Sequence, residues 1–135
     1  MDLQIINIAA NTKNNKEIEN YTHKSKCKNN LCGDQIEIRL IIKKNKIFDI
    51  GYQSQACIYC QASASILSKL VVNKNLIKTN KLINEVLEYF NHKNHFLSKE
   101  TKKLENILNN KNHSRKNCIL LPFKALKKAL RNNYE

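Results

Sequence analysis

Residues 36–53 read IEIRLIIKKNKIFDIGYQ, and this stretch decides the fold of the chain. Apolar and polar side chains alternate in each half, which is typical of a strand that buries one face. Lys44 and Asn45 lie between the halves, where a tight turn is expected. The stretch therefore predicts an antiparallel hairpin with one face on a core. The side chains expected on that face are Ile36, Ile38, Leu40, Ile42, Phe48, Ile50 and Tyr52.

The segments around the hairpin predict a further strand and several helices. Residues 21–28 are expected to form a first, edge strand, which gives a sheet of about three strands. Helical periodicity is present in residues 3–9, 62–71, 82–90 and 96–108 and at the C-terminal end. Ser98 is expected near the start of the helix over residues 96–108, and Pro122 in the first turn of the last helix. With no internal repeat visible, we expect one α+β domain over residues 1–135, with the sheet packed on about four to five helices.

The chain is strongly basic, with a formal net charge of +13 at pH 7 that comes almost entirely from lysine. A basic chain can bind nucleic acid or an anionic membrane. The lysines are scattered, however, and the abundance of Lys, Asn and Ile is also what AT-rich codons favour. Arginine, the usual residue for bidentate contacts to bases and phosphates, occurs only at Arg39, Arg115 and Arg131. We therefore do not expect a nucleic-acid partner.

Localisation can also be predicted from the sequence. No apolar stretch approaches the length of a membrane span, and the N-terminus lacks the features of a signal peptide. We therefore expect a cytoplasmic protein without a membrane partner. In that reducing compartment the five cysteines are expected to bind metal, to react or to be buried rather than to form disulfides.

Three of the cysteines stand in stretches that favour metal or sulfur chemistry. Cys32 and Asp34 flank a glycine whose free backbone lets a soft thiolate and a hard carboxylate converge on one ion, such as zinc or iron. Cys57 lies just before a predicted helix, whose dipole favours the thiolate. Cys118 also leads into a predicted helix, and the arginine and lysine that precede it are expected to lower its pKa.

Three motifs together resemble the family of IscU, SufU and the N-terminal domain of NifU. They are N-x-C-G-D at residues 30–34, A-C-x-x-x-x-A-S-A-S at residues 56–65 and R-x-x-C at residues 115–118. The resemblance implies an α+β scaffold protein, rather than an enzyme, that accepts sulfur from a cysteine desulfurase. It further implies a transient [2Fe–2S] cluster, or a zinc ion, and transfer of the cluster to recipient apo iron–sulfur proteins.

Carried over residue by residue, the resemblance makes Cys32, Asp34, Cys57 and Cys118 the ligands of the cluster or zinc. Asp34 would keep the cluster labile, because a carboxylate is a poorer partner for cluster iron than a thiolate. Cys118 matches the family cysteine that accepts persulfide sulfur. Asn117 stands where IscU proteins have a histidine, the Leu-Pro-Pro-Val-Lys motif is absent, and the stretch between Cys57 and Cys118 is long. These departures favour the SufU branch.

Several alternatives remain open from the sequence. Each ligand could instead be an ordinary buried thiol or a turn aspartate. Cys60 is expected to pack in a helix interface, with a redox or metal role beside Cys57 as the alternative, and Cys27 has no expected role. A zinc hydrolase or deaminase is disfavoured because neither H-x-E nor H-E-x-x-H occurs. The sequence does not decide between a cluster scaffold and a zinc-dependent sulfurtransferase, or between a monomer and a weak homo-oligomer.

Overall fold

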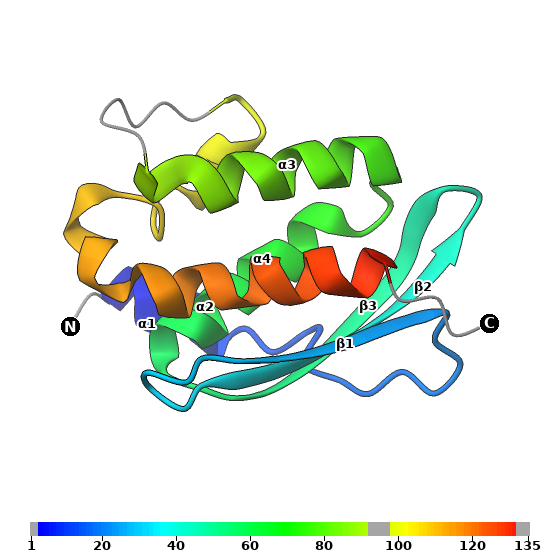
Figure 1. Ribbon diagram of the computed structural model, residues 1–135, viewed down its shortest axis with the longest axis horizontal. Helices are drawn as coiled ribbons and strands as arrows, with labels where there is room; N and C mark the ends of the chain where they lie inside the picture. The colour runs from blue at the N-terminus through cyan, green and yellow to red at the C-terminus, as the bar shows by residue number, and fades with distance from the viewer. Residues whose placement is uncertain (1–2, 92–97, 132–135) are drawn as a thin grey trace.

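The computed structural model describes residues 3–91 and 98–131, where helices cover one face of a three-stranded sheet (Figure 1). The strands are β1, His23–Lys28; β2, Gln35–Lys43; and β3, Lys46–Gln55. They run antiparallel in the order β1-β2-β3, so the strand predicted before the hairpin forms one edge. The α+β prediction with a small antiparallel sheet is confirmed.

The β2–β3 hairpin turns at Lys44 and Asn45, as the sequence predicts. Both residues have positive φ, at 51° and 60°. Two consecutive left-handed residues match the right-handed twist of the flanking strands, and asparagine tolerates this conformation better than most residues. Below the turn, the predicted core face is buried at Ile36, Ile38, Leu40, Ile50 and Tyr52.

The predicted alternation breaks at one point near the tip of the hairpin. The pairing register shifts between Ile41 and Ile42, so that Ile42 lies opposite Ile47. Such a shift changes which side chains face the core. Ile47 is therefore fully buried, whereas Phe48 is 55% exposed. The prediction that Phe48 faces the core is wrong for this reason, and its ring instead lies 4.3 Å from the Lys43 ammonium.

The described residues contain four α-helices and three short 3₁₀ helices. The α-helices are α1, Leu3–Ala10; α2, Ile58–Val71; α3, Leu76–Glu88; and α4, Lys116–Arg131. The 3₁₀ helices are η1, Tyr89–Asn91; η2, Thr101–Leu104; and η3, Asn110–Arg115. Helix α4 contacts β1, β2, α2 and α3, and α1 packs on α2 (Figure 1). Helix α4 is therefore the centre of the packing.

Small residues at the start of α2 allow close contact with α4. Residues 62–65, which read Ala-Ser-Ala-Ser, are all buried. Ser63 Oγ donates a hydrogen bond of 2.6 Å to the carbonyl of Ile119 in α4. Because Cys57 directly precedes α2 and Cys118 lies in the first turn of α4, this contact brings the two cysteines to the same end of the molecule.

The helix predicted over residues 96–108 is wrong where the structure describes that segment. Phe96 and Leu97 lie outside the described residues. Residues 98–115 form turns together with η2 and η3 instead of an α-helix. The apolar side chains that produced the helical periodicity are nevertheless buried: Leu104, Ile107 and Leu108.

Asparagine side chains bond backbone carbonyls at the end of the predicted helix, where it would otherwise extend beyond residue 108. Asn109 Nδ2 donates a hydrogen bond of 2.9 Å to the carbonyl of Glu105. Asn112 Nδ2 donates one of 3.0 Å to the carbonyl of Ile107. These amides occupy carbonyls that an α-helix would use for backbone hydrogen bonds, a competition typical of asparagine.

Glu85 of α3 holds the start of this segment. Its carboxylate accepts hydrogen bonds from the backbone N–H and the hydroxyl of Ser98, at 2.8 and 2.9 Å, and from the Thr101 hydroxyl at 2.8 Å. Burial raises the pKa of Glu85, but these hydrogen bonds and the nearby charge of Lys81 lower it by more. The net pKa lies below the ordinary value, so the ionised carboxylate stabilises the fold at neutral pH.

Helix α4 begins earlier than the sequence predicts. It starts at Lys116, so Pro122 lies inside the helix rather than in its first turn. Proline lacks an N–H, so it cannot donate to the carbonyl of Cys118 four residues earlier. The buried, apolar surroundings of residues 118–123 hold the helix together across this missing bond.

Candidate metal site

The site lies at one end of the molecule, where three segments meet. Cys32 and Asp34 are in the loop between β1 and β2, Cys57 directly precedes α2, and Cys118 is in the first turn of α4. In Figure 1 the β1–β2 loop and the starts of both helices lie at the left end of the view. The residues come from the loop before the hairpin, the segment after it and the last helix, so the fold itself brings them together.

The ligand atoms of Cys32, Asp34 and Cys118 lie within 4.8 Å of one another. The sulfur atoms of Cys32 and Cys118 are 3.9 Å apart. Two thiols and a carboxylate at this separation can share one small cation, because metal–sulfur bonds of about 2.3 Å and metal–oxygen bonds of about 2.0–2.2 Å suit zinc. Cys32 is exposed, whereas Asp34 and Cys118 are buried.

Asp34 has one oxygen with a partner and one without. Its Oδ1 accepts a hydrogen bond of 3.0 Å from the backbone N–H of Cys57. Its Oδ2 is buried and has no hydrogen-bond partner, although the thiols of Cys32 and Cys118 lie nearby. A buried, unpaired carboxylate oxygen is costly unless it binds a cation or a donor. This orphaned atom is what a metal ion between the thiols would satisfy.

The carboxyl group of Asp34 is held in its ionised form. Burial raises its pKa, but the backbone N–H of Cys57 and then the thiols of Cys57, Cys118 and Cys32 lower the pKa by more, so the net pKa is below the ordinary value. The thiols influence the pKa from close range, yet none has hydrogen-bond geometry toward Oδ2.

Cys57 lies beside the three converging residues rather than among them. It is half-buried, and its side chain makes no capping hydrogen bond to α2. Its thiol does act on both buried members of the set, since it lowers the pKa of Asp34 and raises that of Cys118. The prediction that Cys57 is a ligand therefore remains a prediction, with its thiol next to the converging set.

The prediction that neighbouring residues lower the pKa of Cys118 is wrong. Burial raises the pKa of this thiol, and the neighbouring Cys57, Asp34 and Cys32 raise it further. The positive charge of Arg115, which was expected to lower this pKa, lies instead over the Tyr59 ring, with the guanidinium 5.3 Å from the ring centre. A metal ion would reverse the balance, since a coordinating thiol is deprotonated outright.

The loop that carries Cys32 and Asp34 is closed by its own backbone. Gly33 has a φ of +78°, which few residues other than glycine adopt. Its N–H donates to the carbonyl of Asn29 at 2.8 Å, and the N–H of Asn29 donates to the carbonyl of Asp34 at 2.7 Å. The thiol and carboxylate on either side of Gly33 are thus held by a tight turn.

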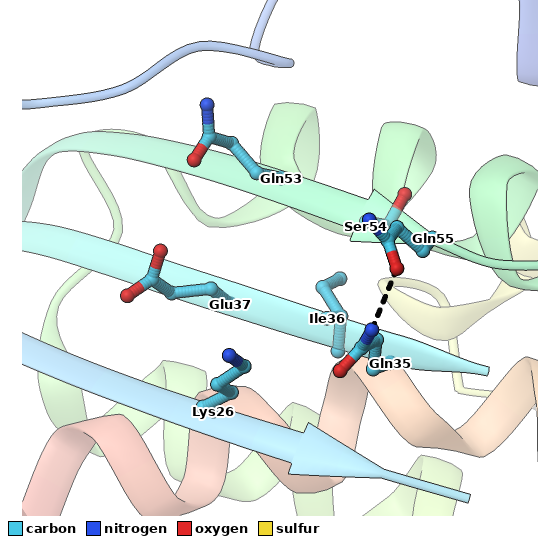
Figure 2. A pocket seen from close by; sticks show the side chains of 7 residues that line it. All are labelled: Lys26, Gln35, Ile36, Glu37, Gln53, Ser54 and Gln55. Carbon is cyan, nitrogen blue, oxygen red and sulfur yellow. Dashed lines mark hydrogen bonds between the residues drawn. The ribbon is translucent and has the colours of Figure 1, made fainter. Parts of the chain in front are cut away.

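A glutamine pair, which the sequence reasoning missed, ties the two site-bearing loops together. Gln35 directly follows Asp34, Gln55 lies two residues before Cys57, and the two glutamines are opposite each other in the sheet. Gln35 Nε2 donates a hydrogen bond of 2.7 Å to Gln55 Oε1 (Figure 2). The hairpin prediction was enough to expect a cross-strand pair near the open end, but the register that selects these partners is visible only in the structure.

The same glutamines line a shallow hollow on the sheet face turned away from the helices (Figure 2). None of the candidate metal ligands lines this hollow. Its volume is about 190 Å³, and its other polar lining includes Lys26, Glu37 and Gln53 (Figure 2). No cysteine lines it. The candidate metal ligands therefore lie at the end of the molecule where the three segments meet, and not in this hollow.

The two remaining cysteines differ in their surroundings. All five cysteines are free thiols. Cys60 is completely buried in α2, where burial and then the charges of Asp34, Cys57 and Cys32 raise its pKa. This packing agrees with the helix-interface interpretation. Cys27 is half-buried in β1, and burial raises its pKa more than Lys128 and Lys124 lower it.

Comparison with known proteins shows the family of this chain. The family described as the NifU-like N terminal domain matches residues 2–135. The chain therefore belongs to the NifU N-terminal family of iron–sulfur cluster assembly scaffolds, which includes IscU and SufU proteins. The resemblance inferred from the three sequence motifs is confirmed.

Two relatives are similar in sequence. An uncharacterized protein of Borreliella burgdorferi is 36% identical over 112 residues, covering 83% of this chain and 74% of the relative. The iron–sulfur cluster assembly scaffold protein IscU of Thermotoga maritima is 27% identical over 128 residues, covering 94% of this chain and 89% of the relative.

Two solved structures have the same fold. A SUF-system scaffold from Fervidobacterium islandicum superposes with a TM-score of 0.80 at 23% identity, covering 96% of each chain. A NifU-like N-terminal protein from Brucella abortus superposes with a TM-score of 0.82 at 18% identity, covering 96% of this chain and 91% of that one. Among the residues that the structure describes, no helix combines the length and apolarity needed to cross a bilayer.

Proposed function

We propose that this protein accepts sulfur from a cysteine desulfurase in the cytoplasm and holds a transient [2Fe–2S] cluster for transfer to apo-proteins. The observation that carries the proposal is the convergence of Cys32, Asp34 and Cys118 around a buried carboxylate oxygen without a partner. Cys57 would complete the set of ligands. A sulfur-rich set with one oxygen suits cluster iron and equally suits zinc.

Each residue of the set would contribute differently to a bound cluster. The thiolates of Cys32, Cys57 and Cys118 would supply the strong bonds, and Asp34 the weaker one. The exposure of Cys32 supports exchange with a partner, because it leaves one side of the site open to approach. The tight turn at Gly33 supports a preformed geometry for that side.

The sulfur-transfer step requires no additional oxidant. The Cys118 thiolate would attack the outer sulfur of a persulfide on the desulfurase. A sulfur–sulfur bond forms at Cys118 as the one in the donor breaks, and the donor cysteine leaves as a thiolate. Because Cys118 is buried and its pKa is raised, the step requires the site to open or a cation to favour its thiolate.

A transfer assay tests this function. The protein is incubated anaerobically with ferrous iron, cysteine and a desulfurase, purified, and mixed with an apo-protein of the [2Fe–2S] class. We expect the recipient's cluster absorbance to appear at a rate that depends on the loaded protein. If the protein only accelerates desulfurase turnover and binds zinc, without iron or sulfide, the zinc-dependent sulfurtransferase alternative is correct.

A further inference from the structure

A basic groove lies between β1 and α4, next to the candidate metal site. Strand and helix run side by side here (Figure 1). The groove has a volume of about 400 Å³, and we call it the lysine groove. Its lining includes Lys26, Lys28, Leu31, Asn117, Lys124 and Lys128. Leu31 directly precedes Cys32 and Asn117 directly precedes Cys118, so one end of the groove is formed by the chain neighbours of two site cysteines.

The lysine groove carries positive charge that its own lining does not neutralise. Four of its lining side chains are exposed lysines, and no acidic residue lines it. Within residues 3–91 and 98–131, none of these lysines forms an ion pair. Lys128 Nζ donates a hydrogen bond of 3.1 Å to the carbonyl of Lys26, which fixes one ammonium across the groove. A groove lined by charges of one sign favours an anionic occupant.

The groove also offers an apolar contact at the end nearest the thiols. Leu31 is 86% exposed, the largest exposure among the large hydrophobic side chains of the described residues. Leu121 is buried beneath the groove and forms part of its lining. An occupant with one apolar side chain at this end would remove the Leu31 side chain from water, which is favourable.

We propose that the lysine groove binds an acidic, extended segment of a partner protein, with an apolar side chain against Leu31. The groove runs beside an edge strand, a geometry that suits an extended peptide. A nucleic acid fits less well, because neither arginine nor an aromatic ring lines the groove. The segment delivers its protein to the exposed Cys32. This last step rests on the proposed function, whereas peptide binding itself requires neither metal nor sulfur.

A binding experiment on the metal-free full-length protein tests the proposal. The probe is a short fluorescein-labelled peptide of Glu and Asp residues around one Leu, followed by fluorescence anisotropy. The test variant carries Lys124→Gln and Lys128→Gln, and the matched control carries Lys78→Gln and Lys81→Gln on α3, where both lysines are exposed. Each pair removes the same charge from a helix, so non-specific attraction falls equally in both.

We expect the groove variant to weaken peptide binding about tenfold, if each of the two lost ion pairs contributes in the upper half of the usual range for exposed pairs. The control should stay within about twofold of the wild type, as expected for loss of distant, screened charge. Leu31→Ser should also weaken binding without changing net charge. Circular dichroism confirms that each variant is folded.

Equal losses in the groove and control variants would overturn the proposal, as would unchanged binding in Leu31→Ser. A single-stranded RNA that displaces the peptide, and that loses affinity only in the groove variant, would overturn the choice of a protein partner. The same variants are then loaded with iron and sulfide using inorganic sulfide. If the groove variant loads normally but no longer binds the peptide, the groove acts in peptide binding alone. If the wild type fails to load, the proposed function is contradicted and the peptide-binding result still stands.

Discussion

Replacing Asp34 with alanine should change the lifetime of a bound cluster while leaving the protein folded. The substitution removes the hydrogen bond of 3.0 Å from the Cys57 N–H to Oδ1, and a bond of this charged type contributes about 1.5–3 kcal/mol. It also removes the buried Oδ2 that has no partner, which relieves a penalty of about 1–3 kcal/mol. The two terms oppose each other, so we expect the free energy of unfolding to change by no more than about 2 kcal/mol.

The cluster itself should live longer in Asp34→Ala. The carboxylate is the hard, exchangeable contact among soft thiolates, and it offers a route for hydrolysis and transfer. We expect slower decay of the cluster absorbance under anaerobic conditions and slower delivery to an apo-protein. Urea unfolding of the metal-free protein measures the stability term separately.

Asp49→Ala is the matched control, because it removes the same charge at the other end of the hairpin. Asp49 forms an ion pair of 3.1 Å with Lys16 on the protein surface, which contributes about 0–1 kcal/mol. Its cluster lifetime should equal that of the wild type. Faster cluster loss in Asp34→Ala would refute the lability argument, and a stability loss above about 2 kcal/mol would refute the cancellation of terms.

Three further predictions follow from the packing and the thiols. Gly51→Ala should lower the free energy of unfolding by about 1–3 kcal/mol in urea, because an added Cβ would lie 2.5 Å from the Lys16 carbonyl oxygen. Glu85→Gln should cost about 2 kcal/mol at pH 7 through lost hydrogen bonds to a charged group. The pKa of Glu85 is lower in the folded state than its ordinary value of 4.5. The extra stability of the wild type should therefore be lost as the pH falls from 4.5 through the lower folded-state pKa. Unfolding curves at several pH values would detect this loss. Cys118→Ser should abolish the persulfide detected by mass spectrometry after incubation with a desulfurase, whereas Cys60→Ser should retain it; the reverse pattern would move the acceptor role to Cys60.

The hairpin and the end of the molecule that carries the site could be predicted because their signals are local. Alternation in residues 36–53 identifies two strands, and the two-residue turn requires them to pair. That pairing brings the residue before β2 and the residues after β3 to the same end, so Asp34 and Cys57 are neighbours for topological reasons. The buried small residues of α2 then admit α4 closely enough to add Cys118.

The failed predictions have causes that depend on long-range packing or side-chain competition. The orientation of Phe48 depends on a bulge at Ile41 and Ile42, a position where three consecutive apolar residues leave the register undetermined by pattern. The helix predicted over residues 96–108 has the right apolar spacing, but its described part forms turns and a 3₁₀ helix, and asparagine side chains bond the carbonyls of Glu105 and Ile107 at its end. The spacing of apolar residues correctly predicted that Leu104, Ile107 and Leu108 are buried, but it did not determine the backbone conformation of the segment.

The expectation for the Cys118 pKa failed because charges near a residue in sequence need not be near it in space. Arg115 lies over the Tyr59 ring, whereas the Cys118 thiol is buried beside Cys57, Asp34 and Cys32. The two candidate sulfur ligands also differ in burial: Cys32 is accessible and Cys118 is not. The persulfide experiment therefore also tests whether the site opens when the desulfurase binds.

Anaerobic loading of matched cysteine variants tests the central claim most directly. The wild type and the variants Cys32→Ser, Cys57→Ser, Cys118→Ser and Cys27→Ser are incubated with ferrous iron and sulfide, and bound iron, labile sulfide and zinc are measured. We predict equal amounts of iron and labile sulfide in the wild type and in Cys27→Ser, whose thiol lies outside the site, and a strong loss in the other three variants. Loading that survives all three site substitutions, or falls as far in Cys27→Ser, would contradict the assignment of the cluster to this site.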